Sequence, residues 1–258
     1  MKYLIPVLGA LLILVVSCSP TVTPGTPVVT KTVIGNGDTL QLSWPAVTSA
    51  QGYYVNLDGT KNTTSALTYL IVDPVKSIKV TAYNGSEESD PWSLTTSVVV
   101  TPSVTVYTLS DPTHNDNAFG FNTTSGACLA LDVTNSANYP DFDFLVEDRS
   151  LTDIEFWAPY LYNNPPPAYN DKENSTAASS AATFDNLVKA AAIGQQLYDT
   201  KFPIAQNGIY SVWIDPDPTS FGANDRFGKV SIEAISGTQV TLKAGYQLIG
   251  ALRWLMSP

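Results

Sequence analysis

Apolar and polar residues alternate in short stretches along the first third of the chain, and this alternation limits the fold more than any other feature. Clear examples are residues 39–44, 53–57 and 78–82. Turn-forming residues flank or separate them, at 35–38, 58–59, 73–74 and 84–85. A period of two is the spacing of β-strands, and short strands about ten residues apart predict an antiparallel β-sandwich.

The same region carries a family pattern. Residues 42–47 and 52–55 have the composition of two consecutive sandwich strands, Leu70 precedes an Asp-Pro turn, and residues 80–85 end in Asn-Gly. In these residues and their spacing, residues 27–102 resemble the fibronectin type III family. The resemblance implies a β-sandwich with Leu70 in its core, and a domain that binds proteins or acts as a spacer.

Trp44 is the expected centre of this core, because a buried tryptophan contributes about 3–5 kcal/mol. We expect its ring to pack across the sandwich against four side chains: Tyr53, Val55, Leu70 and Val80. Lys76 stands where the family usually has a corner tyrosine. The loop at that position is therefore expected to be held in a different way.

The strand pattern resumes in residues 103–258 and predicts a second β-rich domain. Within it, residues 175–201 are Ala-rich, contain no proline and place Phe184, Leu187 and Tyr198 near helical spacing. This segment predicts one amphipathic helix covering a sheet. The apolar tail 246–255 fits either a last strand or a short helix. The expected fold class is therefore mainly β, with a fibronectin type III-like sandwich followed by a β-rich domain with a single helix.

The end of this second region has three strand-like pieces at residues 208–212, 226–232 and 239–242, with Tyr246-Gln247 after them. In these pieces it resembles the HmuY-type surface lipoproteins. That family holds haem iron with a pair of histidines, whereas His114 is the single histidine of this chain. The resemblance therefore implies at most a shared topology, and we expect no haem.

The first residues predict export and a lipid anchor. Lys2 is followed by an apolar run over residues 4–16 and then by Ser17 and Cys18. A basic start and a short apolar stretch are typical of a signal peptide, and the cysteine after it resembles the lipobox of bacterial lipoproteins. The resemblance implies cleavage after residue 17, palmitate and other acyl chains on Cys18, and a linker over residues 18–26. Ordinary secretion and an uncleaved membrane span are the alternatives.

The expected location is the cell envelope, at the outer membrane or the cell surface, with the lipid as the contact to the membrane. The net charge is −10 and the isoelectric point is about 4.4, and an acidic surface repels nucleic acid and anionic headgroups. We therefore expect no nucleic-acid partner. Cys128 has no second cysteine to pair with if Cys18 is lipidated, so it is expected to be a small buried apolar residue.

An aromatic, proline-rich stretch over residues 157–169 is the most unusual segment of the chain. It contains four rings on Trp157, Tyr160, Tyr162 and Tyr169. Prolines stiffen the backbone, so exposed rings there would lose little entropy on binding a sugar or a protein. The simpler alternative is that the rings fold back over the sheet.

Two groups of acidic residues are candidates for chemistry. Asp215, Asp217, Asn224 and Asp225 offer oxygen ligands of the kind that calcium prefers, although a solvated hairpin turn explains them more simply. Asp141, Asp143, Asp153 and Glu155 lie beside aromatic residues, with Asp141 and Asp143 on one face. Paired carboxylates can hydrolyse glycosides across a cleft, and solvent-facing polar positions explain them equally well.

Apart from calcium at that loop, we expect no cofactor. The sequence thus favours a non-enzymatic envelope lipoprotein that acts as a binding or scaffolding module for a protein or glycan. A carbohydrate-binding lipoprotein that uses loop 157–169 is the alternative, and a polysaccharide hydrolase is a weaker one.

Overall fold

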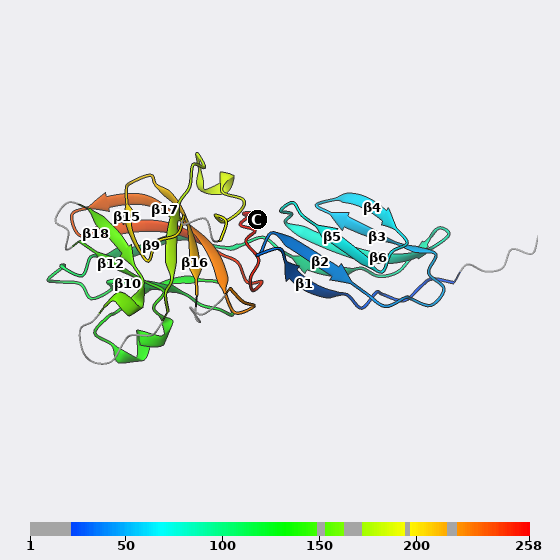
Figure 1. Ribbon diagram of the computed structural model, residues 1–258, viewed down its shortest axis with the longest axis horizontal. Coiled ribbons are helices and arrows are strands. Elements are labelled where there is room, and N and C mark those ends of the chain that lie inside the picture. The colour runs from blue at the N-terminus through cyan, green and yellow to red at the C-terminus, as the bar shows by residue number, and fades with distance from the viewer. Residues whose placement is uncertain (1–21, 149–152, 163–171, 194–196, 216–220) are drawn as a thin grey trace, which may run out of the picture.

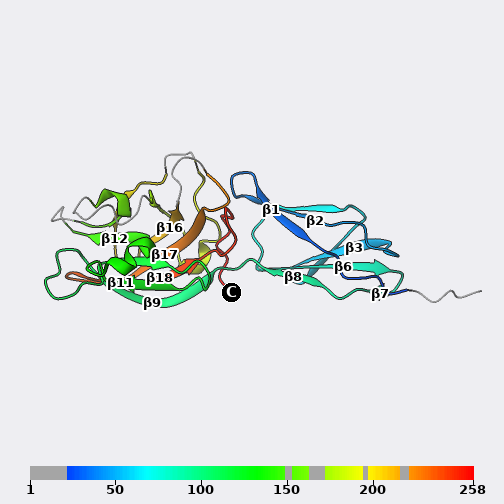
Figure 2. The same cartoon turned by 90° about the horizontal axis from the view of Figure 1, so that it is seen from below.

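The computed structural model describes residues 22–148, 153–162, 172–193, 197–215 and 221–258. These residues form two β-rich domains that follow one another along the long axis of the molecule (Figure 1). The turned view shows the same division, with β1–β8 in one domain and the later strands in the other (Figure 2). Mainly β structure confirms the expected fold class.

The first domain is a sandwich of two antiparallel sheets. One sheet has the order β1-β2-β5, and the other has the order β4-β3-β6-β7, with β8 also paired to β6. The strands are β1 (Thr30–Ile34), β2 (Thr39–Ser43), β3 (Gly52–Leu57), β4 (Thr60–Thr64), β5 (Thr68–Ile71), β6 (Ser77–Asn84), β7 (Glu87–Glu88) and β8 (Trp92–Thr95). This is the fibronectin type III-like arrangement that the sequence predicts.

Trp44 lies in the core of this sandwich, as predicted. Its side chain is buried and its ring centroid lies 5.2 Å from that of Tyr53. The expectation for Leu70 is wrong, because Leu70 is 56% exposed whereas Ile71 is buried. Leu40 of β2 lies directly opposite Ile71, and residues opposite each other in a sheet share a face. The inward position of Leu40 therefore turns Ile71 into the core and Leu70 out of it.

The loop at Lys76 is held by a carboxylate. Asp58 accepts hydrogen bonds from the backbone nitrogens of Lys76 at 3.0 Å and Ser77 at 2.8 Å. The hydroxyl of Thr96 donates to the carbonyl of Val75. These bonds fix the entry into β6 without the corner tyrosine of the family.

The second domain contains two five-stranded antiparallel sheets, with the orders β11-β10-β12-β13-β15 and β14-β16-β17-β18-β9. The strands are β9 (Val99–Tyr107), β10 (Ala118–Phe121), β11 (Cys128–Leu131), β12 (Phe144–Glu147), β13 (Ile154–Trp157), β14 (Ser175–Ala178), β15 (Lys201–Ile204), β16 (Ile209–Ile214), β17 (Arg226–Ser236) and β18 (Gln239–Tyr246). The expected domain boundary at residue 102 lies within β9, which pairs with β18 along its length from Val99.

A phenylalanine-rich core lies between these two sheets. Phe119 stacks on Phe144 at 5.3 Å and meets Phe156 edge-on at 5.0 Å. Val212 and Leu242 contribute to the same cluster from the other sheet. Cys128 is buried beside them as a free cysteine, which confirms the expectation of a small buried residue. Burial raises the pKa of its thiol.

The predicted helix over residues 175–201 is wrong. The described part of this segment contains β14 and the short 3₁₀ helix η3 (Phe184–Asn186), and no α-helix. Ser175–Ala178 pair with β16 at the sheet edge, and Thr176 also bridges to Asp199. An open sheet edge supplies hydrogen-bond partners that compete with a helix, so tertiary pairing overrides the helical propensity of alanine.

The C-terminal tail over residues 247–258 is neither a strand nor a helix. Figure 1 shows it between the two domains. Trp254, Leu252 and Ile249 of this tail belong to the core cluster of the first domain. Trp254 is fully buried, and its indole nitrogen donates to the carbonyl of Asp38 at 3.1 Å. Residues of the C-terminal tail thus complete a core whose other buried members lie between Leu40 and Ala82.

A turn between β1 and β2 receives this tail. Asp38 forms ion pairs with Arg253 at 2.7 Å and with Lys189 at 2.8 Å. Gly37 has a φ of +86°, and a Cβ atom there would lie 2.4 Å from the carbonyl oxygen of Ala251. Glycine at this position therefore permits both the turn and the close approach of the tail.

Candidate functional site

A cavity of about 460 Å³ opens in the second domain beside Asp143, and we call it the Asp143 pocket. Its apolar walls come from β10, β11, η1 (Ser136–Asp141) and β16, and consist of Phe121, Leu129, Leu131, Pro140 and Ile214. Its main polar walls consist of Asp141, Asp143, Lys172, Asn224 and Arg226. This volume lies in the range of about 300–1,000 Å³ that is usual for small-molecule sites.

Asp143 is buried and fully engaged. Its carboxylate accepts hydrogen bonds from the backbone nitrogen of Phe121 at 2.7 Å and from the Asn174 amide at 3.4 Å, and it pairs with the Lys172 ammonium at 2.9 Å. Burial raises the pKa of Asp143, and the charge of Lys172 opposes the rise. Asn174 also accepts from the backbone nitrogen of Asp215 at 2.7 Å. Asp143 thus ties β10 to the segments that precede β14 and follow β16.

Tyr246 lies at the end of β18 and is 1% exposed. Its ring stacks on Phe121 with centroids 4.9 Å apart. The hydroxyl oxygen is buried and has no hydrogen-bond partner among the described residues. Burial and the nearby charge of Asp143 raise the pKa of this phenol, and the charge of Arg226 lowers it. The hydroxyl therefore lies within electrostatic reach of both charged walls of the pocket.

Arg226 begins β17 and, like Tyr246, has a donor without a hydrogen-bond partner among the described residues. One terminal nitrogen donates to the carbonyls of Ala223 at 2.8 Å and Asp225 at 2.9 Å. Its Nε atom is buried and has no partner among the described residues. Buried donors without partners are rare in folded proteins, because each one loses its bonds to water. Both residues that carry such a donor here, Tyr246 and Arg226, line the Asp143 pocket.

The aromatic stretch turns its described rings toward the protein. The indole nitrogen of Trp157 donates to Glu155 at 2.7 Å, and the Lys201 ammonium lies 4.0 Å from the centre of the indole ring. The Tyr160 hydroxyl lies 3.3 Å from that of Thr200. Trp157 and Tyr162 pack against the buried cluster of Ala118, Phe142 and Leu145. Tyr169 lies outside the described residues.

The described members of the candidate calcium site lie in different surroundings. Asp225 is buried and accepts hydrogen bonds from the indole nitrogen of Trp213 and the backbone nitrogen of Gly222, both at 3.2 Å. Asn224 lines the Asp143 pocket, Asp215 is buried at the end of β16, and Asp217 lies outside the described residues. In the part of the chain that the structure describes, no three His, Cys, Asp or Glu side chains form a group that could hold a metal ion.

Asp141 and Asp143 both line the pocket. The expectation that they share one face of a strand is wrong, because Asp141 ends η1 and Asp143 precedes β12. Lys172, Arg226 and Tyr246 were not recognised in the sequence as site residues. Lys172 precedes β14, whereas Arg226 begins β17 and Tyr246 ends β18, and each is an ordinary residue in its own segment. What distinguishes Tyr246 and Arg226 is a buried donor without a hydrogen-bond partner among the described residues, and hydrogen-bond partners are known only from the folded structure.

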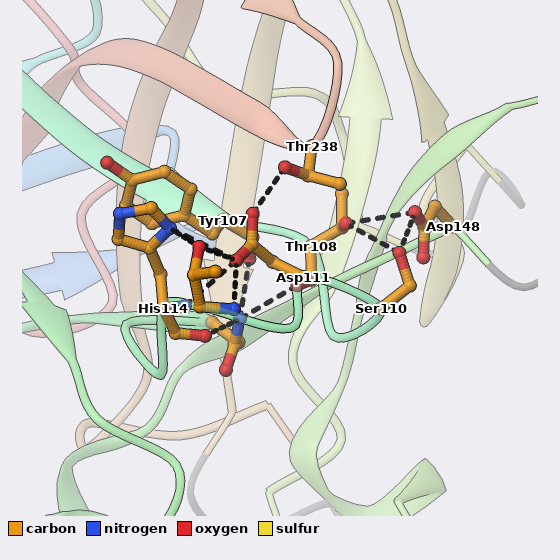
Figure 3. A network of polar contacts seen from close by, with 9 residues as sticks. Tyr107, Thr108, Ser110, Asp111, His114, Asp148 and Thr238 are labelled. Atoms are coloured by element: carbon orange, nitrogen blue, oxygen red, sulfur yellow. Dashed lines mark hydrogen bonds and ion pairs between the residues drawn. The ribbon is translucent and has the colours of Figure 1, made fainter.

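The single histidine lies in a second polar cluster at the far end of β9 (Figure 3). Its ring stacks on Tyr107 with centroids 3.7 Å apart, and its Nδ1 atom lies 3.0 Å from Asp111 and 2.9 Å from the Thr113 hydroxyl. Thr238 donates to Asp111 at 2.5 Å, and this hydroxyl is the main reason that the pKa of Asp111 is lowered. The carboxylate and the hydroxyl reach the same histidine nitrogen, whereas a catalytic triad needs them on opposite nitrogens.

Comparison with known proteins gives structural neighbours only. No protein-family model and no curated protein matches the chain. A DUF4466 family protein from Parabacteroides merdae matches with a TM-score of 0.43 and 12% identity, over 90% of this chain and 96% of that one. A structure of an FN3tt mutant matches with a TM-score of 0.24 and 26% identity, over 28% of this chain and 92% of that one. A segment of two fibronectin type III domains from chicken tenascin matches with a TM-score of 0.23 and 12% identity, over 86% of this chain and 97% of that one.

Proposed function

We propose that this protein is a non-enzymatic, lipid-anchored protein of the bacterial cell envelope, and that its second domain binds a small molecule in the Asp143 pocket. One observation carries the binding part of the proposal: Tyr246 and Arg226 line a cavity of about 460 Å³, and each has a buried donor without a partner among the described residues. Groups of this kind are satisfied when a ligand supplies the missing acceptor.

Binding fits the carboxylates of the pocket better than hydrolysis does. A general acid has to release its proton to a substrate, and a nucleophile needs a free oxygen. The Asp143 oxygens are occupied by Lys172, Asn174 and the backbone of Phe121. We therefore assign Asp143 the role of fixing the pocket wall.

The first domain serves as a spacer in this proposal. The first described residues lie beside the β6–β7 end of the sandwich, where Asn84 donates to the carbonyl of Val22 at 3.1 Å. That end faces away from the second domain (Figure 2). A lipid on Cys18, which lies outside the described residues, would place the first domain between the membrane and the pocket. Within the described chain, no helix is long and apolar enough to cross a bilayer.

Metabolic labelling with palmitate tests the anchor. We expect Cys18→Ala to abolish labelling and to release the protein from the membrane fraction. Cys128→Ala is the matched control, because Cys128 is buried in the second domain, and it should keep full labelling. Label retained in the Cys18→Ala variant would refute the anchor.

A fragment screen by ligand-observed NMR on the full chain tests the pocket. Leu129 lines the pocket and is 49% exposed, so Leu129→Trp should narrow the cavity without disturbing a core. Leu70→Trp places the same ring on an exposed position of the first domain. Fragments should bind the wild type and the Leu70→Trp variant and lose binding to Leu129→Trp. Equal binding to all three proteins, or to none, would refute the pocket as the binding site.

Glycan binding by loop 157–169 is the alternative. Trp157→Ala combined with Tyr160→Ala should then abolish binding on a glycan array. Binding that survives both substitutions would exclude these rings as the site.

A further inference from the structure

We infer that the Asp143 pocket selects a small organic monocarboxylate with an apolar body. The inference deepens the proposed function and rests on it. It starts from the lack of hydrogen-bond acceptors for two donors of the pocket residues. The Tyr246 hydroxyl and the Arg226 Nε–H are both donors, and neither has an acceptor among the described residues. The ligand must therefore bring an acceptor.

The acceptor is expected to be anionic. Arg226 forms no ion pair with any described carboxylate, whereas Lys172 is paired with Asp143 at 2.9 Å. Arg226 is thus the cation of the pocket that has no ion-pair partner among the described residues. Hydrogen bonds from a guanidinium to a carboxylate are among the strongest in proteins, and a tyrosine hydroxyl is a further donor.

A single negative charge fits better than a double one. Asp141 and Asp143 are carboxylates in the same cavity. Asp143 is compensated by Lys172, but the exposed Asp141 adds negative potential that a phosphate dianion would meet. Repulsion between like charges grows with the charge of the ligand. A monocarboxylate therefore gains the contact with Arg226 at the smallest electrostatic cost.

The rest of the ligand is expected to be apolar. Phe121, Leu129, Leu131, Pro140 and Ile214 form the apolar part of the cavity surface, and the polar side chains of Asn122, Thr123 and Asn224 lie beside them. Leu129 is 49% exposed in the structure, and covering such a side chain with an apolar body is favourable. A hydroxyl-rich sugar acid would leave several of its groups without partners against these walls.

Titration of the full chain with benzoate tests the inference. Benzamide is the neutral isostere, glucuronate is a carboxylate with a polar body, and inorganic phosphate is an anion without an apolar body. We expect benzoate to bind most tightly. Loss of one hydrogen bond to a charged group corresponds to roughly tenfold or more in affinity, and we expect benzamide to be weaker than benzoate by at least that factor.

Tyr246→Phe is the decisive variant, because it removes only a hydroxyl that has no partner among the described residues. We expect it to weaken benzoate roughly tenfold while the melting temperature of the unliganded protein stays the same or rises. Tyr210→Phe is the matched control. The Tyr210 hydroxyl accepts from the backbone nitrogen of Ala205 at 2.8 Å in the core, outside the pocket, so this variant should melt earlier and bind benzoate as the wild type does.

Three results would overturn the inference: benzamide or phosphate binding as tightly as benzoate, glucuronate binding as tightly as benzoate, or unchanged benzoate affinity in Tyr246→Phe. If neutral fragments still bind in a manner that Leu129→Trp abolishes, only the carboxylate preference is wrong and the proposed function stands. If no compound binds in a manner that Leu129→Trp abolishes, the proposed function fails as well.

Discussion

The two domains differ in what they bury. Among the described residues, the buried polar side chains of the first domain are Ser89 and Thr96, both uncharged. The second domain buries charged groups as well, including Asp143, Glu147 and Lys229. A charge removed from water costs free energy unless it is paired and hydrogen-bonded. The second domain therefore needs ion pairs and hydrogen bonds to offset the cost of its buried charges, and the same domain contains the pocket.

The domains also differ in how they complete their cores. The main core of the second domain consists of residues from its own strands, whereas the core of the first domain also includes Ile249, Leu252 and Trp254 of the C-terminal tail. A fibronectin type III-like sandwich is thereby made dependent on the far end of the chain. Four predictions test these differences, ordered from the largest expected effect to the smallest.

Trp254→Ala should have the largest effect and should act on the first domain. It removes a fully buried indole from that core, and we expect a loss of about 3–5 kcal/mol in the free energy of unfolding. Tryptophan fluorescence during urea denaturation measures it. Trp92→Ala is the control, because Trp92 belongs to the same core but is only partly buried, and its cost should be smaller. Equal costs would show that the tail is not part of the core.

Lys172→Met should destabilise the second domain by about 2–3 kcal/mol, because it leaves Asp143 buried without its cation. The difference in stability between the wild type and the Lys172→Met variant should decrease as the pH falls. A buried carboxyl whose pKa is raised binds a proton more readily in the folded than in the unfolded state, so acid favours the folded variant. Chemical denaturation at several pH values measures this trend. Lys79→Met, at an exposed position on β6, should cost almost nothing, and a deficit independent of pH would contradict the pairing.

Lys229→Met should cost about 2 kcal/mol, because the buried carbonyls of Phe184 and Leu187 lose their shared donor. Burial lowers the pKa of Lys229 to about 8. Its folded pKa lies below the unfolded value, so the unfolded state binds more protons and the stability of the wild type should rise as the pH increases above about 8. The Lys229→Met variant should lack this rise. Parallel pH profiles of the two proteins between pH 8 and pH 9.5 would show that the charge of Lys229 is not linked to folding.

Tyr246→Phe should have the smallest effect on stability, within about 0.5 kcal/mol or slightly stabilising, because the lost hydroxyl has no partner in the described part of the chain. Tyr210→Phe should cost about 1–3 kcal/mol, since it leaves the Ala205 backbone nitrogen unsatisfied. Thermal denaturation of the pair compares an unpaired with a paired phenol in one domain. A large loss in Tyr246→Phe would show that its hydroxyl is satisfied in solution.

Local pattern predicted the first domain well and the second only in part. In the first domain, alternation at residues 39–44 and 78–82 gave the correct strands and the buried Trp44. The one error, Leu70, was a shift of one residue, which exchanges the two faces of a strand. In the second domain, helical spacing over residues 175–201 was overridden by pairing with β16.

The candidate site was predicted only in fragments. Asp141, Asp143 and Asn224 were singled out as acidic or polar positions, and all three line the pocket. Lys172, Arg226 and Tyr246 were not, because no local pattern distinguishes them. Their role depends on which hydrogen-bond partners they lack, and a missing partner is a property of the folded environment.

The sequence by itself determined the strand-rich fold class, the sandwich that spans β1 to β8 and the burial of Trp44 and Cys128, because residue alternation and apolar content act locally. The tertiary structure alone decided that Ser175–Ala178 form a strand, that Trp254 fills the core of the other domain, and that Tyr246 and Arg226 face one cavity. Each of these depends on contacts between segments far apart in the chain. Such contacts are selected by the free energy of the whole fold and not by any single stretch of residues.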